Sequence, residues 1–280
     1  MIDLYIDCHA HLFFSPIPLE AIDEDITGEI PTPTMEFISK MISSAKEKAV
    51  SHIVGVISNP NDFPSYRLQL EFENIIHVIG IQRGKALEEH SHLISLLNKE
   101  IERKMPHAIG EIGLDYGYGF DNLNNRERET LKKGQQELFR KQIRLAKDFD
   151  LPIVVHAGYG MDKDIVEILK QEQAQDVGGQ IHGYMSKNEY VSEVLDMGFF
   201  ISFGYIHTIE EELKEIIEIT PLERILIETD SPYHLIDSPK RFILPEDVYL
   251  ITDEIAHLKG IKPEVFANQI MKNARDLFRF

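Results

Sequence analysis

The stretch Ile6-Asp7-Cys8-His9-Ala10-His11, which follows a short apolar run starting at Ile2, determines how the rest of the chain is interpreted. Side chains alternate between the two faces of a β-strand, so Asp7, His9 and His11 would project to one side. Two imidazoles and a carboxylate at the end of a first strand could form half of a metal site. A strand that merely ends in polar residues is the alternative, because a metal site needs further ligands from distant parts of the chain.

Strand-like apolar runs alternate with amphipathic segments along the whole sequence. The expected strands are Leu4–Ile6, Ile53–Ile57, Ile75–Ile79, Ala108–Ile112, Ile153–His156, Gly179–His182, Phe199–Phe203 and Ile225–Glu228. The expected helices include Glu36–Ala49, Leu87–Arg103, Glu127–Phe149, Asp162–Gln171, Pro245–Lys259 and Pro263–Phe278. Apolar strands that alternate with helices favour a parallel sheet covered on both faces. About eight such units predict an α/β fold, a (β/α)8 TIM barrel formed by one domain over residues 1–280. A doubly wound open sheet is the alternative, weakened because no G-x-G-x-x-G motif follows the first strand.

Composition limits the classes of partner. With 280 residues, of which 43% are hydrophobic, the chain can bury a substantial core. It has one cysteine, no visible secretory signal and no apolar run near the roughly 20 residues that span a bilayer, so we expect a cytoplasmic protein without a membrane partner. The net charge of −18 argues against a basic footprint for long duplex DNA. A nucleic-acid partner would be a short end, contacted with the help of metal cations.

The predicted strand ends carry the residues suited to chemistry. In a barrel, functional side chains come from the carboxyl ends of several strands. Those ends hold His9, His11, Glu111, His156, His182 and Asp230. Each alone has a plain alternative, such as a satisfied polar residue or, for Asp230, a turn former before Ser231-Pro232. Together they supply enough nitrogen and oxygen ligands to suggest two metals.

Other residues after the strands are candidates for substrate contacts. His207 and His234 follow strands seven and eight and could line the pocket. Arg83 and Lys85 follow strand three, and Lys240 and Arg241 follow strand eight; both pairs could grip phosphate or could be solvated loop charges. The proline-rich segment from Phe13 to Thr34 is expected to be a long loop at the active-site face, either a cap over the pocket or an inert insertion.

The sequence resembles the TatD family of metal-dependent hydrolases, within the amidohydrolase-like barrels, nearly from end to end. The matching motifs are residues 6–11, 109–116, 151–156, 181–182, 198–204, 226–233 and 273–278. The resemblance implies a two-metal site in which His9, His11 and Asp230 hold the first metal. It further implies that Glu111 bridges the metals, that His156 and His182 hold the second, and that Asp230 orients or deprotonates the attacking water. Family members are described as deoxyribonucleases, often 3′ exonucleases acting on single strands.

The substrate shell departs from the family pattern. Members usually carry an arginine soon after the strand-five histidine, whereas this chain has His156-Ala157-Gly158. The run after strand six is His182-Gly183-Tyr184 in place of a His-Cys-Phe type, and Phe242–Pro245 replaces the usual Asn-x-Pro element. The loop from Phe13 to Thr34 is also longer than usual.

Three functions therefore remain open. The first is a phosphodiesterase or deoxyribonuclease that acts on short or single-stranded DNA ends by two-metal activation of water, with Asp230 and Glu111 as catalytic residues. The second is a metallohydrolase of a small amide, ester or phosphoester. The third is a metal-binding barrel without catalysis, against which the presence of Asp230 argues. The ligand set suits Mg²⁺, Mn²⁺ or Zn²⁺ in different settings, and the oligomeric state is left open.

Overall fold

The computed structural model describes residues 4–13, 34–117, 120, 123–158, 160–184, 188–232, 234–235 and 238–280. Within these ranges, the side chains at 188–189, 209, 212, 234–235 and 238–241 are left out of the description. Most of the expected loop between Phe13 and Thr34 therefore lies outside the described residues. The same holds for the side chains of His234, Lys240 and Arg241.

Eight parallel strands form one sheet in which each strand pairs with its neighbours in the sequence. Ala10, at the end of the first strand, forms a parallel bridge with Ser231, just after the eighth. The Asp230 N–H also donates to the His9 carbonyl at 2.9 Å, so the first and last strands meet and the sheet curls into a (β/α)8 barrel, as the sequence predicts. The strands are β1 Tyr5–Ala10, β2 Val50–Ile57, β3 Ile75–Ile79, β4 Ala108–Leu114, β5 Ile153–Ala157, β6 Gly179–His182, β7 Phe200–Phe203 and β8 Ile225–Ile227.

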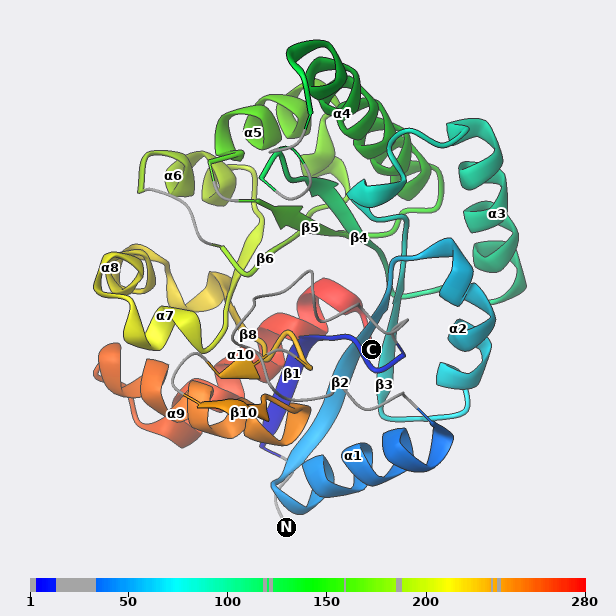
Figure 1. Ribbon diagram of the computed structural model, residues 1–280. Coiled ribbons are helices and arrows are strands. Elements are labelled where there is room, and N and C mark those ends of the chain that lie inside the picture. The colour runs from blue at the N-terminus through cyan, green and yellow to red at the C-terminus, as the bar shows by residue number, and fades with distance from the viewer. Residues whose placement is uncertain are drawn as a thin grey trace.

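Helices surround the strands on the outside of the barrel (Figure 1). The Thr34 hydroxyl caps the first of them by accepting from the Phe37 N–H, and a capping box of Asn124 and Glu127 starts α4. The helices are α1 Met35–Glu47, α2 Phe63–Gln69, α3 His90–Arg103, α4 Asn125–Asp148, α5 Asp162–Gln171, α6 Asn188–Asp196, α7 Ile206–Ile209, α8 Glu211–Ile219, α9 Val248–Leu258 and α10 Pro263–Phe278.

The core lies inside the barrel and between the strands and helices. Every residue of β3 and β4 is buried, which explains why these strands are apolar almost throughout and not alternating. Six helices agree with the predicted segments to within a few residues, whereas α2, α6, α7 and α8 were not predicted as separate elements. A short antiparallel hairpin, β9 His234–Leu235 and β10 Ser238–Phe242, follows β8 and was also not predicted. Across the described ranges, no helix combines the length and the apolar character that a membrane crossing requires.

Candidate metal centre

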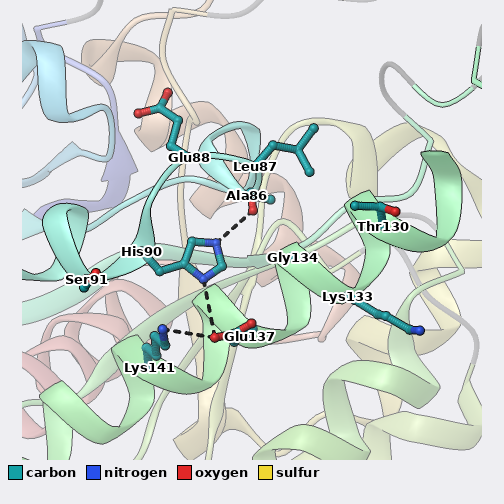
Figure 2. A pocket seen from close by; sticks show the side chains of 10 residues that line it. All are labelled: Ala86, Leu87, Glu88, His90, Ser91, Thr130, Lys133, Gly134, Glu137 and Lys141. Atoms are coloured by element: carbon teal, nitrogen blue, oxygen red, sulfur yellow. Dashed lines mark hydrogen bonds and ion pairs between the residues drawn. The ribbon is translucent and has the colours of Figure 1, made fainter. Parts of the chain in front are cut away.

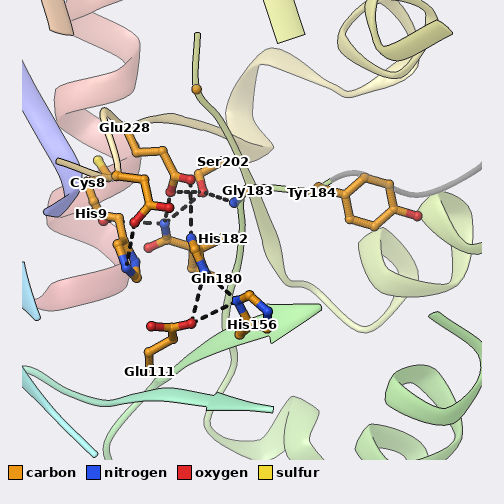
Figure 3. Close-up of polar contacts among 12 residues, drawn as sticks. Cys8, His9, Glu111, His156, Gln180, His182, Gly183, Tyr184, Ser202 and Glu228 are labelled. Atoms are coloured by element: carbon orange, nitrogen blue, oxygen red, sulfur yellow. Dashed lines mark hydrogen bonds and ion pairs between the residues drawn. The ribbon is translucent and has the colours of Figure 1, made fainter. Parts of the chain in front are cut away.

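The ends of five strands bring the predicted ligands together. His9 belongs to β1 and His11 follows it directly. Glu111, His156 and His182 lie in β4, β5 and β6. Asp230 follows β8 and is fastened to β1 by its backbone bond to His9. Figure 3 shows four of these side chains converging, with Glu111 facing His156 and His182.

One group of donors gathers around the two histidines of the first strand. The Nε2 atoms of His9 and His11 lie 3.3 Å apart. Asp230 Oδ1 lies 3.5 Å from each of these nitrogens, and Glu111 Oε2 lies 3.6 Å from that of His11. His9, His11 and Glu111 each offer an atom within 4.8 Å of the others, which is close enough for a single ion to reach all three.

A second group forms on the other oxygen of Glu111. Its Oε1 atom lies 2.8 Å from His156 Nδ1 and 3.4 Å from His182 Nε2, and these two nitrogens are 3.1 Å apart. Glu111 thus directs one oxygen to each group. Among the described residues, Glu111 is therefore shared by two groups of three possible ligands, and a third group joins His9, His182 and Glu228.

The protonation states of His9, His11 and Glu111 suit the binding of a cation. Burial, together with the neighbouring His182 and His11 rings, lowers the pKa of His9 well below its usual value, and burial lowers that of His11. Both imidazoles are therefore neutral near pH 7, the form that binds metals. Burial alone would raise the pKa of Glu111, but the adjacent His156 and His182 outweigh it and hold that pKa well below the ordinary range. The first group thus combines the neutral nitrogens of His9 and His11 with the charged carboxylate of Glu111.

Three buried polar atoms in the site have no hydrogen-bond partner among the described residues. They are Asp230 Oδ1, His9 Nδ1 and His156 Nε2. An unsatisfied buried carboxylate oxygen is costly, and a cation beside Asp230 Oδ1 would remove that cost. Burial also raises the pKa of Asp230 to about 7. The donor set and these unpaired atoms fit a metal centre.

Glu228 supports the second group from behind, a role that the sequence analysis did not assign. The side chain is 1% exposed, and its Oε1 lies 3.3 Å from His182 Nδ1. Its Oε2 accepts from the Ser202 hydroxyl and, at 3.1 Å, from Gln180 Nε2. A carboxylate can only accept, so it keeps the proton on His182 Nδ1 and leaves Nε2 as the metal-facing atom. The position of Glu228, two residues before Asp230 at the end of β8, was the signal in the sequence that could have indicated this role.

Asp7 supports the first group. This fully buried carboxylate accepts from the Thr229 N–H at 2.9 Å, from the Thr229 hydroxyl and from the His9 N–H at 3.3 Å. Burial nevertheless raises its pKa to about 8. Asp7 therefore ties β1 to the segment that carries Asp230, and so fixes two predicted ligands relative to each other.

Comparison with known proteins agrees with this geometry. The family model described as TatD related DNase matches residues 6–279. The chain belongs to the TatD family. Over 99% of both chains it is 31% identical to the uncharacterized metal-dependent hydrolase YabD of Bacillus subtilis. It is 26% identical to tatdn3 of Danio rerio, a protein named as a candidate deoxyribonuclease, over 98% of this chain and 97% of that one.

A solved structure shows the same fold. The crystal structure of YJJV, a TatD homolog from Escherichia coli K12, superposes with a TM-score of 0.81 over the full length of both chains, at 21% identity. The sequence and structural likenesses make this protein a TatD-type metal-dependent hydrolase with a TIM barrel.

Of the predicted substrate-binding residues of this TatD protein that are described, Arg83 contacts the centre, whereas Lys85 and His207 make other contacts. Arg83 reaches the centre, with Nη1 3.2 Å from Glu111 Oε1. Lys85 instead pairs with Glu88 at 2.8 Å. His207 is fully buried: its Nδ1 accepts from the Gly204 N–H and its Nε2–H donates to the Tyr184 carbonyl. Both ring nitrogens are thus used by the backbone, and His207 supports loops where a substrate contact was predicted.

A surface hollow between the start of α3 and helix α4 does not include any of the predicted ligands (Figure 2). His90 Nε2–H donates to the Ala86 carbonyl at 2.8 Å, and Glu137 pairs with Lys141 at 3.0 Å. These polar groups satisfy one another, so the candidate site of this TatD protein is the centre at the strand ends.

Proposed function

We propose that this protein is a two-metal phosphodiesterase that removes nucleotides from short or single-stranded DNA ends. The observation that supports the proposal most strongly is the position of Glu111, whose Oε2 lies near His11 and whose Oε1 lies near His156 and His182. His9, His11 and Asp230 would hold one ion, His156 and His182 the other, and Glu111 would bridge them. Divalent cations there would act as Lewis acids that favour deprotonation of water and neutralise charge at phosphorus.

Asp230 is the proposed general base. It has a buried oxygen without a hydrogen-bond donor among the described residues, so this oxygen is able to accept the proton of an attacking water. Burial places its pKa at about 7, close to the value at which a base works best near neutral pH. The backbone bond to His9 and the contact between Asp7 and Thr229 hold the carboxylate in position.

The choice of DNA rests on the family description and on relatives such as tatdn3, and the chain's charge sets the form of the substrate. A net charge of −18 disfavours long duplexes, whose binding draws on many basic contacts, so a short end is the better fit. A metallohydrolase of a small amide, ester or phosphoester is the second candidate. The same acidic charge and the sequence departures around the site favour it.

The test uses metal-loaded protein and a short single-stranded DNA labelled at its 5′ end, with EDTA-treated protein and Asp230→Asn as controls. Stepwise loss of 3′ nucleotides that both controls abolish is the expected result. Intact DNA with metal verified in the protein would transfer the assignment to a small-molecule hydrolase. If the metal-loaded protein also fails to hydrolyse a panel of small esters, amides and phosphoesters, the result would indicate a metal-binding barrel without catalysis.

A further inference from the structure

Among the arginines and lysines that the structure describes, Arg83 is the one whose side chain contacts Glu111. It follows β3 and turns its guanidinium to the strand ends, where Nη1 lies 3.2 Å from Glu111 Oε1 and Nε lies 3.3 Å from Asp115 Oδ2. The side chain is 24% exposed. Its Nη2 atom has no partner among the described residues, so one face of a fixed cation remains available beside the shared carboxylate.

Asp115 fixes this guanidinium and is itself firmly held. Gln135, from α4, accepts from the Asp115 N–H and donates to its carbonyl, both at 2.8 Å. The Gly117 N–H donates to Asp115 Oδ1 at 2.9 Å, and Asp115 Oδ2 lies 3.3 Å from Arg83 Nε and 3.6 Å from His156 Nε2. The cation is therefore positioned by a chain of contacts that begins in the buried side chain of Gln135.

Gly158 makes room for Asp115. A Cβ atom at position 158 would lie 2.9 Å from Asp115 Cα, closer than real Cβ atoms approach, and 3.0 Å from its Cβ and Cγ, tighter than most Cβ contacts. A larger residue after β5 would therefore displace Asp115 and, with it, Arg83. The glycine in His156-Ala157-Gly158 and the arginine after β3 belong to one arrangement.

We propose that Arg83 is the residue that selects a phosphate-bearing substrate, with Asp115 as its positioning residue. The inference rests on the proposed phosphodiesterase function and adds the group that recognises the anionic diester. A guanidinium is a planar group of charged N–H donors that suits phosphate oxygens. With Nε on Asp115 and Nη1 on Glu111, the Nη2 atom keeps its donors for a phosphate oxygen. The carboxylates of Glu111, Asp115 and Asp230 in and beside the centre repel an anionic substrate, and this cation offsets that repulsion.

The experiment compares two dithymidine analogues by calorimetry on Zn²⁺-loaded protein. One has a charged phosphorothioate linkage, and the other has an uncharged methylphosphonate linkage. Arg83→Gln should weaken binding of the charged analogue on the order of 10- to 100-fold and leave the uncharged one unchanged. Arg83→Lys should fall between, since it keeps the charge without the planar donors. Arg67→Gln is the matched control, because Arg67 pairs with Glu100 away from the centre.

Metal content is the second readout. Arg83→Gln should keep the wild-type amount of metal, because it removes no ligand. Asp115→Asn should weaken binding of the charged analogue by less, and the Asp115→Asn/Arg83→Gln double variant should be no weaker than Arg83→Gln alone. The inference is overturned if Arg83→Gln binds the charged analogue as Arg67→Gln does, or if wild-type protein does not prefer that analogue. A preference that depends on Arg83 without DNA cleavage would reject the proposed function alone.

Discussion

His182 lies between two carboxylates, with Nδ1 3.3 Å from Glu228 Oε1 and Nε2 3.4 Å from Glu111 Oε1. Burial would lower the pKa of His182, but Glu228 and Glu111 outweigh it and raise that pKa well above its ordinary value. The same two carboxylates would attract a dication to this point. Glu228 sets the orientation of the His182 ring, so the metal affinity of the second ligand group depends on a residue outside that group.

Glu228→Gln should therefore weaken metal binding about 10- to 100-fold, a loss typical of such supporting residues. A glutamine amide nitrogen cannot accept from both Ser202 and Gln180 as Glu228 Oε2 does. Competition with a chelator of known affinity measures the loss. Glu100→Gln is the matched control, because Glu100 is also a buried carboxylate but pairs with Arg67. Equal metal affinity in the two variants would contradict the supporting role.

Asp230→Asn should reduce turnover to near background while the protein stays folded. Asp230 has a φ of 51°, in the left-handed region that asparagine tolerates better than most residues, so the change removes the base with little backbone strain. Steady-state rates and thermal unfolding of the variant check both parts. Full activity would exclude Asp230 as the base.

Asp7→Asn should lower the free energy of unfolding by about 1–3 kcal/mol, the cost of disturbing buried hydrogen bonds. Oδ1 of Asp7 accepts from the Thr229 and His9 N–H groups, so the asparagine nitrogen would have to take the place of Oδ2. There it would face the Thr229 hydroxyl, which would have to turn and would lose the acceptor for its own proton. Urea unfolding of metal-free protein measures the change. An unchanged midpoint and slope would show that Asp7 does not fasten β1 to the end of β8.

His77 should make stability fall in mild acid. Burial and the nearby His107 lower the pKa of His77 to about 4, and its Nδ1 accepts from Gln69 Nε2. The unfolded chain takes up this proton near pH 6.5, so stability present above that pH is lost as the pH falls towards 4. Between pH 8 and 5, wild-type protein should lose about 2 kcal/mol more than His77→Gln. Urea unfolding in EDTA at both pH values tests this, and equal losses would refute it.

The sequence predicted the barrel and its strand ends because both depend on local pattern. Apolar runs at regular spacing indicate parallel strands, and chain order then places His156 and His182 beside each other at one end. The residues that hold the ligands in place, Asp7 and Glu228, could not be predicted in this way. Asp7 meets Thr229 across 222 residues, and Glu228 meets His182 across 46, so these contacts depend on sheet closure. The use of both His207 nitrogens by backbone groups was likewise invisible, because it depends on how two loops pack.

The most direct test of the central claim is the number of metal ions bound per chain in wild-type protein and in Glu111→Gln. Both would be stripped, reloaded with Zn²⁺ or Mn²⁺, freed of excess ion and measured by inductively coupled plasma mass spectrometry. We predict two ions per wild-type chain and fewer than two in the variant, because one carboxylate serves both groups. A single ion in wild-type protein, or two retained by Glu111→Gln, would contradict the shared-carboxylate centre.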